Sequence, residues 1–456
     1  VRVRLRTMLH VSLLIVLLTV VGVRCDESVS VEVGSDGVQE VVEEETKHPN
    51  SLEVIFENQS GRKVELYWDD NVNGVLQSEL SHTGQITINT YIGHRFYFTP
   101  AGSGGDKASA LYKVAMERHT GIVTLYDERT MKERGEEFEK QKNEFMKSYL
   151  DRTGMRWKNY YPREPLTHFM YNFTNIGQQI DAKSSHAQYT DCSAEVIEQV
   201  ADNIKQQTDA DEGAEPRGNK TVPKFYPAET DAFDVLYHNG SYFCRDKSQT
   251  DLTFTINVLC AGPKVAYFDN FLSPQECEHI KAVGQTLGLL RSTVSEEALQ
   301  TEDRTSSTVW IERKHSPIIN NIVQRIADVV NIDESKLYLN QSSESLQLVH
   351  YEPGQLYKSH VDYGTDRPHN RYITFLMYLN TVGGGGFTSF PKAPKECKNE
   401  DGYFGVEPVQ GRVAFFYDLL ADGNVDDLTQ HYAEPPTEGN EKWMTNLWIW
   451  DAVFTR

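Results

Sequence analysis

The chain has 456 residues and a formal net charge of −21, with 66 Asp and Glu against 45 Lys and Arg. This length is sufficient for two or three domains whose hydrophobic cores need no disulfide support. Because nucleic-acid binding requires basic patches that contact phosphates, the charge argues against a nucleic-acid partner.

The first residues have the pattern of a secretory leader. Arg2, Arg4 and Arg6 precede the apolar run "LHVSLLIVLLTVVGV" at residues 9–23. This pattern predicts a signal peptide over residues 1–25, with an uncleaved signal anchor as the alternative. Residues 26–50 contain eight acids and one lysine, which predicts a disordered acidic spacer. We therefore expect a protein of the endoplasmic reticulum lumen or secretory pathway, attached to the membrane only if the leader is retained.

Glycosylation sequons and cysteines are consistent with this compartment. The sequons predict a glycoprotein, and they lie at Asn58, Asn172, Asn219, Asn239 and Asn340. Of the six cysteines, Cys244 and Cys260 flank two short β-like runs. A disulfide between these two is plausible in an oxidising compartment, but the sequence leaves the pairing open.

The next segments predict a small β domain and a helix. β-rich runs at 52–58, 63–70, 85–98 and 121–127 are separated by turn residues, which predicts a small antiparallel β-sandwich over residues 51–128. In residues 131–152, Phe138, Phe145, Met146 and Tyr149 fall on one helical stripe, which predicts an amphipathic helix. Residues 129–262 are predicted to form a helical or irregular connection, with an exposed loop at 208–221.

Residues 263–456 predict a separate α+β domain. Ser273, Pro274 and Glu276 have the pattern of a capped helix start, and Ser316-Pro317 begins a second helix. Four strand-like runs follow at 344–351, 371–379, 411–418 and 442–451. Two helices and a run of strands predict a double-stranded β-helix, or jelly roll, that is backed by helices.

A His-x-Asp pair suggests a metal centre in this domain. His360 and Asp362 follow a strand-like run, and residues two apart on a strand point the same way. An imidazole and a carboxylate are two of the three ligands of the 2-His-1-carboxylate triad that binds non-haem Fe(II). His431, after a later strand, is the candidate third ligand, whereas His350 and His369 are interpreted as structural or exposed.

Lys442 stands at the start of the last strand. A lysine at this position has two interpretations. It could be an ordinary solvated strand end, or it could pair with the far carboxylate of a dicarboxylate co-substrate that is bound to the metal.

A family resemblance joins these residues. Residues 265–456 contain "RTSS", "LQLVHYEPGQLYKSHVDY", "RYITFLMYLN", "GGGGFTSFP", "GRVAFFYDL" and "GNEKWMTNLW" in that order. This series resembles the catalytic domain of the collagen-type prolyl 4-hydroxylases, which use Fe(II), 2-oxoglutarate, O2 and ascorbate. The resemblance implies His360, Asp362 and His431 as iron ligands and Lys442 as the partner of 2-oxoglutarate. By position it also implies a pocket for the co-substrate, lined by Tyr351, Thr388 and Trp448. It implies a neighbouring peptide site that contains Tyr357, Arg371 and Trp450.

The resemblance implies hydroxylation of peptidyl proline to 4-hydroxyproline, with succinate and CO2 as co-products. Lys442 favours proline, because related lysyl and oxygen-sensing enzymes place Arg there. Two departures concern the substrate: the interval from His431 to Lys442 is one residue longer than usual, and Trp450 stands where relatives commonly have a His. The alternatives are the same chemistry on another residue or a small molecule, or a non-catalytic binding protein. The expected substrate is a proline-rich peptide or protein, and a disulfide isomerase is a candidate partner.

The N-terminal β-rich segment has a fainter resemblance. Trp68, Thr90, Tyr91, His94 and Phe96 lie near matching positions of the von Hippel-Lindau β-domain, which binds hydroxyproline in a peptide. This resemblance implies Trp68, Thr90, His94 and Phe96 as candidate hydroxyproline-reading residues. The alternative is that Trp68, Tyr91 and Phe96 are ordinary core residues and His94 a turn residue.

Overall fold

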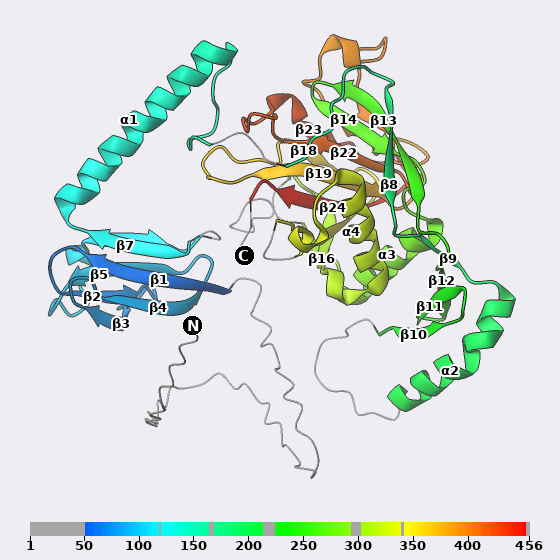
Figure 1. Cartoon of the computed structure of the whole chain (residues 1–456), viewed down its shortest axis with the longest axis horizontal. Coiled ribbons are helices and arrows are strands. Elements are labelled where there is room, and N and C mark those ends of the chain that lie inside the picture. Colours follow the sequence, from blue (N-terminus) through cyan, green and yellow to red (C-terminus); the bar gives the residue numbers. More distant parts are fainter. Residues whose placement is uncertain are drawn as a thin grey trace, which may run out of the picture. The chain divides into compact units, whose positions relative to one another are not determined.

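The computed structural model describes residues 51–117, 120–163, 168–212, 224–292, 302–338 and 342–452 (Figure 1). Within these ranges the chain is α+β, with mostly β-structure and four α-helices. The predicted leader and acidic spacer lie outside the described residues, as does the predicted loop at 208–221 from residue 213 onward. Its first part was predicted wrongly, because residues 208–212 are the end of a helix. None of the described helices combines the length and the apolar character that crossing a membrane requires.

Two sheets form the N-terminal part. One has the order β4-β1-β7, built from β1 (Ser51–Gln59), β4 (Gln85–Tyr91) and β7 (Ile122–Tyr126). The other has the order β3-β2-β5-β6, built from β2 (Val64–Trp68), β3 (Val75–Leu80), β5 (Arg95–Pro100) and β6 (Tyr112–Ala115). They share one hydrophobic core, which is made of Leu52, Val54, Phe56, Val64, Leu66, Leu80, Phe96, Phe98, Met116, Val123 and Leu125.

The pairing of β1 and β7 corrects the prediction of a purely antiparallel arrangement, because these two strands are parallel. A parallel pair needs a long crossover, and here the chain passes through both sheets between β1 and β7. Strands β3 and β6 were not predicted. They are short, and their exposed residues give no run of apolar alternation.

Helix α1 (Glu128–Thr153) follows β7 and confirms the predicted amphipathic helix. Asp127 caps its first turn, accepting a hydrogen bond from the backbone N–H of Thr130, and Gly154 ends it with a φ of 71°. Tyr149 is buried on its apolar stripe, and its ring lies against that of Trp157 at 5.1 Å between centroids. The end of α1 therefore leads directly into a packed segment.

The C-terminal part contains a nine-stranded sheet of order β15-β16-β17-β24-β19-β22-β14-β13-β8 and a four-stranded sheet of order β18-β23-β20-β21. The strands of the large sheet are β8 (Gln179–Ser184), β13 (Leu252–Ala261), β14 (Lys264–Phe268), β15 (Leu290–Arg291), β16 (Ser307–Ile311), β17 (Leu346–Tyr351), β19 (Arg371–Tyr378), β22 (Val413–Tyr417) and β24 (Lys442–Trp450). The small sheet consists of β18 (Tyr357–His360), β20 (Thr388–Ser389), β21 (Gly405–Val406) and β23 (His431–Ala433).

Alternate residues of the central strands serve two different cores. On β19, Ile373 and Phe375 belong to the core that also contains the buried faces of α3 (Pro274–Leu287) and α4 (Pro317–Val330). Leu376 and Tyr378 belong to the second core, together with Ala433 and other residues of the small sheet. The large sheet is thus covered on both faces, which explains why its strands read as continuous apolar runs. Both helices begin as predicted, and α3 has the full Ser273–Glu276 capping box.

The predicted boundary at residue 262 is wrong, because β13 pairs with β14 across it and with β8 on its other side. The region between α1 and β14 also contains α2 (Ala194–Glu212) and a four-stranded sheet of order β10-β11-β12-β9. Its strands are β9 (Tyr189–Asp191), β10 (Tyr226–Glu229), β11 (Phe233–His238) and β12 (Ser241–Asp246). The short, partly polar strands gave only a weak sequence signal.

The disulfides also differ from the favoured pairing. Cys244 bonds to Cys192, with 5.1 Å between the Cα atoms, and Cys260 bonds to Cys397, with 5.3 Å. Cys244 lies on β12, which pairs with β9 close to Cys192, whereas Cys260 lies on β13 in a different sheet. Cys277 on α3 is a buried free thiol. The two predicted partners are therefore separated by sheet topology.

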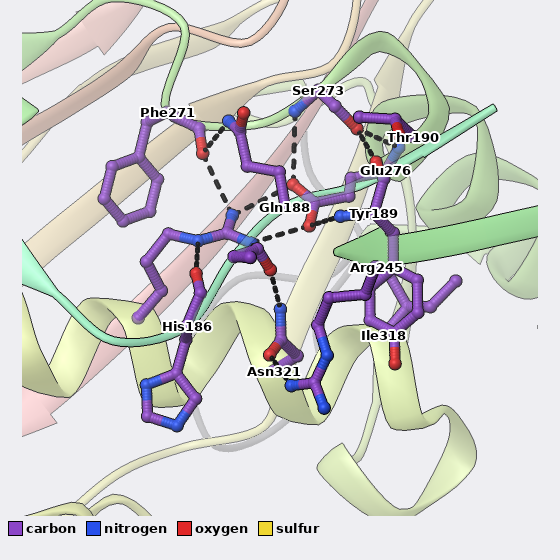
Figure 2. Close-up of polar contacts among 12 residues, drawn as sticks. His186, Gln188, Tyr189, Thr190, Arg245, Phe271, Ser273, Glu276, Ile318 and Asn321 are labelled. Carbon is purple, nitrogen blue, oxygen red and sulfur yellow. Dashed lines mark hydrogen bonds and ion pairs between the residues drawn. The ribbon is translucent and has the colours of Figure 1, made fainter. Parts of the chain in front are cut away.

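A fully buried ion pair joins the two helices to the segment before β9 (Figure 2). The Arg325 guanidinium donates to both carboxylate oxygens of Glu276 at 2.9 and 2.8 Å, and to the backbone oxygens of His186, Ala187 and Phe271. Glu276 also accepts from the backbone N–H groups of Tyr189 and Ser273. All five N–H donors of the guanidinium are thus used, as a buried charge requires.

Candidate metal centre and its cavity

The small sheet brings the three predicted ligands together. His360 at the end of β18 lies opposite His431 at the start of β23, and Asp362 follows two residues after His360. One ligand atom from each of the three lies within 4.8 Å of the others. The Nε2 atoms of His360 and His431 are 3.6 and 3.9 Å from the Asp362 carboxylate oxygens. Two imidazoles and one carboxylate therefore converge on one point.

Backbone hydrogen bonds orient both imidazoles. His360 Nδ1 donates to the oxygen of Lys358 at 2.7 Å, and His431 Nδ1 donates to the oxygen of Thr429 at 3.0 Å. Because a carbonyl can only accept, the proton lies on Nδ1 and the Nε2 lone pair faces the centre. Burial, followed by the neighbouring His431, lowers the pKa of His360 to about 3. The ring is thus neutral, as a metal ligand must be.

The Asp362 carboxylate is also held from behind. Its Oδ2 accepts from the Thr374 hydroxyl at 2.9 Å and from the Trp448 indole N–H at 2.8 Å. Burial opposes its ionisation, but the two imidazoles and Arg371 outweigh it and hold its pKa below the usual value. The Thr374 hydroxyl lies 2.8 Å from the buried Asp418 as well. Such outer partners fix the orientation of a ligand.

The centre opens into a cavity of about 810 Å³. All six predicted co-substrate and peptide residues line it, namely Tyr351, Thr388, Trp448, Tyr357, Arg371 and Trp450. A shift of register between Arg371 and Ile373 turns Arg371 to this face of the sheet. The cavity therefore collects the predicted residues from three adjacent strands and from β18 and β20.

Lys442 is fully buried behind two residues of the cavity wall, Tyr351 and Thr388. Its Nζ lies 3.4 Å from the Thr388 hydroxyl and over the rings of Tyr351 and Tyr378, at 5.5 and 5.4 Å from their centroids. Burial lowers its pKa to about 7, and Glu434 opposes this shift. The interpretation of Lys442 as a solvated strand end is wrong. None of the described carboxylates forms an ion pair with Lys442 Nζ, so a buried ammonium at this position can receive an anion.

The sequence did not single out several residues at the other end of the cavity. Glu344 binds the Arg371 guanidinium at 2.7 and 3.1 Å and accepts from the Trp450 indole N–H at 2.8 Å. Arg371 also lies over the Trp448 ring at 3.8 Å from its centroid. Arg304 lies over Tyr357 at 4.7 Å. The alternation of side chains along β17 and β24 could have indicated which residues face the cavity. The contacts of Glu344 and Arg304 could not be predicted in this way, because they join residues that are far apart in the sequence.

The loop after Asp362, residues 363–370, forms part of the cavity rim and is held by the segment after α1. Asn159 is buried, and its amide donates to the backbone oxygens of Gly364 and Arg367 at 3.4 and 3.0 Å. The backbone N–H of Tyr160 donates to the oxygen of Thr365 at 2.6 Å. Arg163 pairs with Asp451 and donates to the oxygen of Pro368. We call residues 157–163 the strap.

Two other histidines agree with their prediction as structural or exposed. His350 stacks on Trp443 at 3.9 Å and bonds to Glu441, on the face away from the centre. The side chain of His369 is 49% exposed.

In the N-terminal sheets, the Thr90 hydroxyl is 2.9 Å from His94 Nδ1, and the rings of Trp68 and Tyr91 lie 5.2 and 5.4 Å from His94. Trp68 and His94 line a small hollow of about 240 Å³. Phe96 instead packs in the core against Phe56, as the alternative interpretation expected. Tyr91 is 43% exposed, so its interpretation as a core residue is wrong.

The comparisons with known proteins agree with this geometry. Residues 346–450 match the family model of the 2OG-Fe(II) oxygenase superfamily. Probable prolyl 4-hydroxylase 7 of Arabidopsis thaliana is 33% identical over 220 residues, which cover 44% of this chain and 67% of that protein. Probable prolyl 4-hydroxylase 3 of the same plant is 31% identical over 210 residues, covering 42% of this chain and 71% of that protein.

The prolyl 4-hydroxylase subunit alpha-1 of Mus musculus is 32% identical over 200 residues, but the match covers only 34% of that protein. A solved viral collagen prolyl hydroxylase from Paramecium Bursaria Chlorella virus-1, in its 2OG complex, is 26% identical with a TM-score of 0.33, covering 42% of this chain and 98% of that one. On the extent of its match to the plant enzymes, this chain belongs to the prolyl 4-hydroxylase family of 2OG-Fe(II) oxygenases.

Proposed function

We propose that the chain hydroxylates peptidyl proline to 4-hydroxyproline, with Fe(II), 2-oxoglutarate and O2, releasing succinate and CO2. The observation that carries this proposal is the convergence of His360, Asp362 and His431 at the wall of a cavity, together with the buried Lys442 that contacts the cavity residues Tyr351 and Thr388. The relatives named prolyl 4-hydroxylases support proline as the residue that is modified.

The residues fit a ferrous ion. The three side chains supply the 2-His-1-carboxylate set, with both Nε2 lone pairs directed inward. When bound, Fe(II) with 2-oxoglutarate and O2 supplies the oxidising chemistry that replaces a C–H bond by a C–OH bond. The chain itself orients its three ligands through Thr374, Trp448 and the two backbone carbonyls.

Lys442 and Thr388 fit the distal carboxylate of 2-oxoglutarate. The ammonium is buried, Glu434 acts on it only from a distance, and the dicarboxylate would bring a negative charge into direct contact with it. The rings of Tyr351 and Tyr378 flank the ammonium and exclude water from it, which strengthens the pairing.

At the outer end, Tyr357, Arg371 and Trp450 are proposed to contact the peptide. Arg371 is held by Glu344 and by the Trp448 ring, so its position is fixed before any peptide binds. A preorganised wall of this kind loses little entropy on binding.

The test is incubation of the chain without its leader with Fe(II), 2-oxoglutarate, ascorbate and a panel of proline-rich peptides, followed by mass spectrometry of peptides and succinate. We expect oxygen on proline in the wild type and none with His360→Ala. His350→Ala is the matched control, because its ring lies on the other face of the sheet and should leave turnover intact. Succinate without oxidised proline would remove proline as the target, and no succinate would refute the dioxygenase.

The proposal extends to the organisation of the chain. We place a double-stranded β-helix in the paired large and small sheets of the C-terminal part, and a β-sandwich in residues 51–128. The shared cores of each pair of sheets support this.

The hollow beside Trp68, Thr90 and His94 is proposed as a hydroxyproline reader. A comparison of proline and hydroxyproline peptides for binding to wild type and His94→Ala tests this.

The proposed location is the endoplasmic reticulum lumen or secretory pathway, supported by the two disulfides. The sequons agree only in part: Asn58 is fully buried and bonds to the backbone oxygens of Arg62 and Leu80, so the folded chain has no room for a glycan there. Asn172 and Asn239 are exposed. The disulfide isomerase partner stays a prediction, which co-purification from a secretory cell would test.

A further inference from the structure

A second cavity, of about 740 Å³, lies apart from the metal centre. Most of its lining comes from α3, from β11 and β12 and from the turn between these strands, and none of its residues lines the catalytic cavity. At the start of β24 the two cavities take alternate residues. Lys442 contacts the catalytic cavity wall, whereas Glu441 and Trp443 line the second cavity. The second cavity is therefore a separate place for a ligand.

Two histidines of this cavity each have a buried nitrogen that lacks a hydrogen-bond partner among the described residues. The atoms are His238 Nε2 and His279 Nδ1. His238 ends β11 and is 4% exposed, whereas His279 lies on α3 and is 1% exposed. Their ring centroids are 5.6 Å apart. Because an unsatisfied buried polar atom is costly, a ligand that bonds to both nitrogens gains free energy.

The other hydrogen bonds of the two rings determine which free nitrogen is a donor. His238 Nδ1 donates to the backbone oxygen of Lys224 at 2.7 Å, so its Nε2 is an acceptor. His279 Nε2 is 2.6 Å from Ser316 Oγ, which already accepts from two backbone N–H groups in the first turn of α4. The Ser316 hydroxyl therefore donates to Nε2, and the neutral His279 ring carries its proton on Nδ1. Burial, followed by the neighbouring His238, lowers the pKa of His279 to about 3 and keeps this ring neutral.

The histidine pair thus offers one acceptor and one donor to the same ligand. In an extended peptide, the N–H and C=O groups of one residue point to the same side, as in a hydrogen-bonded pair of β-strands. Such a residue can donate to His238 Nε2 and accept from His279 Nδ1. Proline cannot make the first of these bonds, because it has no backbone N–H.

The rim of the second cavity is acidic. Asp191, Glu278 and Glu441 are exposed carboxylates of its lining. Among the residues that line it, Lys281 is the one lysine or arginine, and it already pairs with Glu278 at 2.6 Å. Trp443 adds an aromatic wall. A rim of this charge attracts Lys and Arg side chains, and aromatic faces also bind cations.

We propose that the second cavity binds an extended basic segment of another protein. The N–H and C=O groups of one residue of that segment bond to His238 and His279, and its Lys or Arg side chains lie against the acidic rim. Binding needs neither Fe(II) nor 2-oxoglutarate. This inference is therefore independent of the proposed proline hydroxylation.

The test is isothermal titration calorimetry of the chain without its leader, in the absence of Fe(II) and 2-oxoglutarate. The ligands are blocked alanine-based peptides that carry Lys, Glu or no charged residue. His238→Asn keeps a donor for the Lys224 oxygen but removes the acceptor of the pair. His279→Gln keeps a partner for the Ser316 hydroxyl but removes the donor of the pair. Binding is measured at a temperature at which thermal unfolding shows every variant to be folded.

The charge of the rim is tested separately. Glu278→Gln with Glu441→Gln removes two of its carboxylates. Glu229→Gln is the matched control, because Glu229 is an exposed acid of β10, in the same sheet as β11, and does not line the cavity. The double variant should weaken binding of the Lys peptide several-fold, as should added salt, whereas Glu229→Gln should match the wild type.

We expect the Lys peptide to bind the wild type more tightly than the neutral peptide does, and the Glu peptide not to bind. Each histidine variant should weaken binding of the Lys peptide about 2–10-fold, the size of one neutral hydrogen bond. A proline-rich peptide should not displace the Lys peptide.

No binding of the Lys peptide up to about 1 mM would overturn the site. It would mean that water, or a direct bond between the two rings, satisfies the histidine nitrogens. Equal binding of the Lys and Glu peptides, or unchanged binding in both histidine variants, would also overturn it.

Discussion

Replacement of Arg325 by methionine tests how much the buried ion pair stabilises the C-terminal part. The change removes five N–H donors. Among the described residues it leaves the Glu276 carboxylate, which is 0% exposed, with two backbone N–H partners, those of Tyr189 and Ser273. Breaking a buried pair in this way costs roughly 3–5 kcal/mol. For a domain of this size we expect the thermal midpoint to fall by roughly 6–20 °C.

The measurement is thermal unfolding followed by circular dichroism and by tryptophan fluorescence, with coincidence of the two as the check for a single transition. Lys183→Met is the control, because its pair with Asp251 is exposed and should contribute under about 1 kcal/mol. The double variant Arg325→Met with Glu276→Leu should recover much of the lost stability, since it removes the unpaired charge. A single variant as stable as the control, or a double variant that simply sums two losses, would refute the reasoning.

Three further predictions concern the site. Thr374→Val removes the hydroxyl that donates to Asp362, and it should weaken Fe(II) binding by about 10–100-fold in equilibrium dialysis. Thr445→Val is the control and should not weaken it, because the buried Thr445 hydroxyl has no hydrogen-bond partner among the described residues. Lys442 is charged below its pKa of about 7, so KM for 2-oxoglutarate should rise as the pH increases above about 7. Lys442→Met should raise this KM at low pH and remove its dependence on pH. A wild-type KM that does not change with pH would contradict this prediction. Asn159→Ala frees two carbonyls of the rim loop and should raise KM for peptide while leaving KM for 2-oxoglutarate unchanged; equal changes in both would indicate general destabilisation instead.

Local signals in the sequence were sufficient for α1, α3 and α4 and for two of the three metal ligands, but they did not indicate α2. The capping box at Ser273 and Glu276 depends on neighbours three residues apart, and His360 with Asp362 depends on strand alternation. His431 and Lys442 were only candidates before the family resemblance gave them roles, because strands far apart in sequence bring them to the site. They could not have been assigned from spacing alone.

Long-range pairings account for what the sequence did not predict. The parallel contact of β1 with β7, the bond between Cys260 and Cys397 and the contacts of Asn159 with the rim loop all join segments that are distant along the chain. Short polar strands such as β3 add little hydrophobic signal. Gln347 accepts hydrogen bonds from Arg304 and Asn446, and only the folded sheet brings these residues near it.

The pairing of β14 with β13 has a consequence for where this enzyme can be cut. A chain that starts at residue 263 keeps every residue of the metal centre but loses β13 and β8, so β14 becomes the outer strand of the sheet. Its unpaired backbone N–H and C=O groups would then be a template for edge-to-edge association. It would also lose the strap that holds the rim loop. The smallest soluble catalytic fragment should therefore begin before the strap, near the start of α1, rather than where the family resemblance begins.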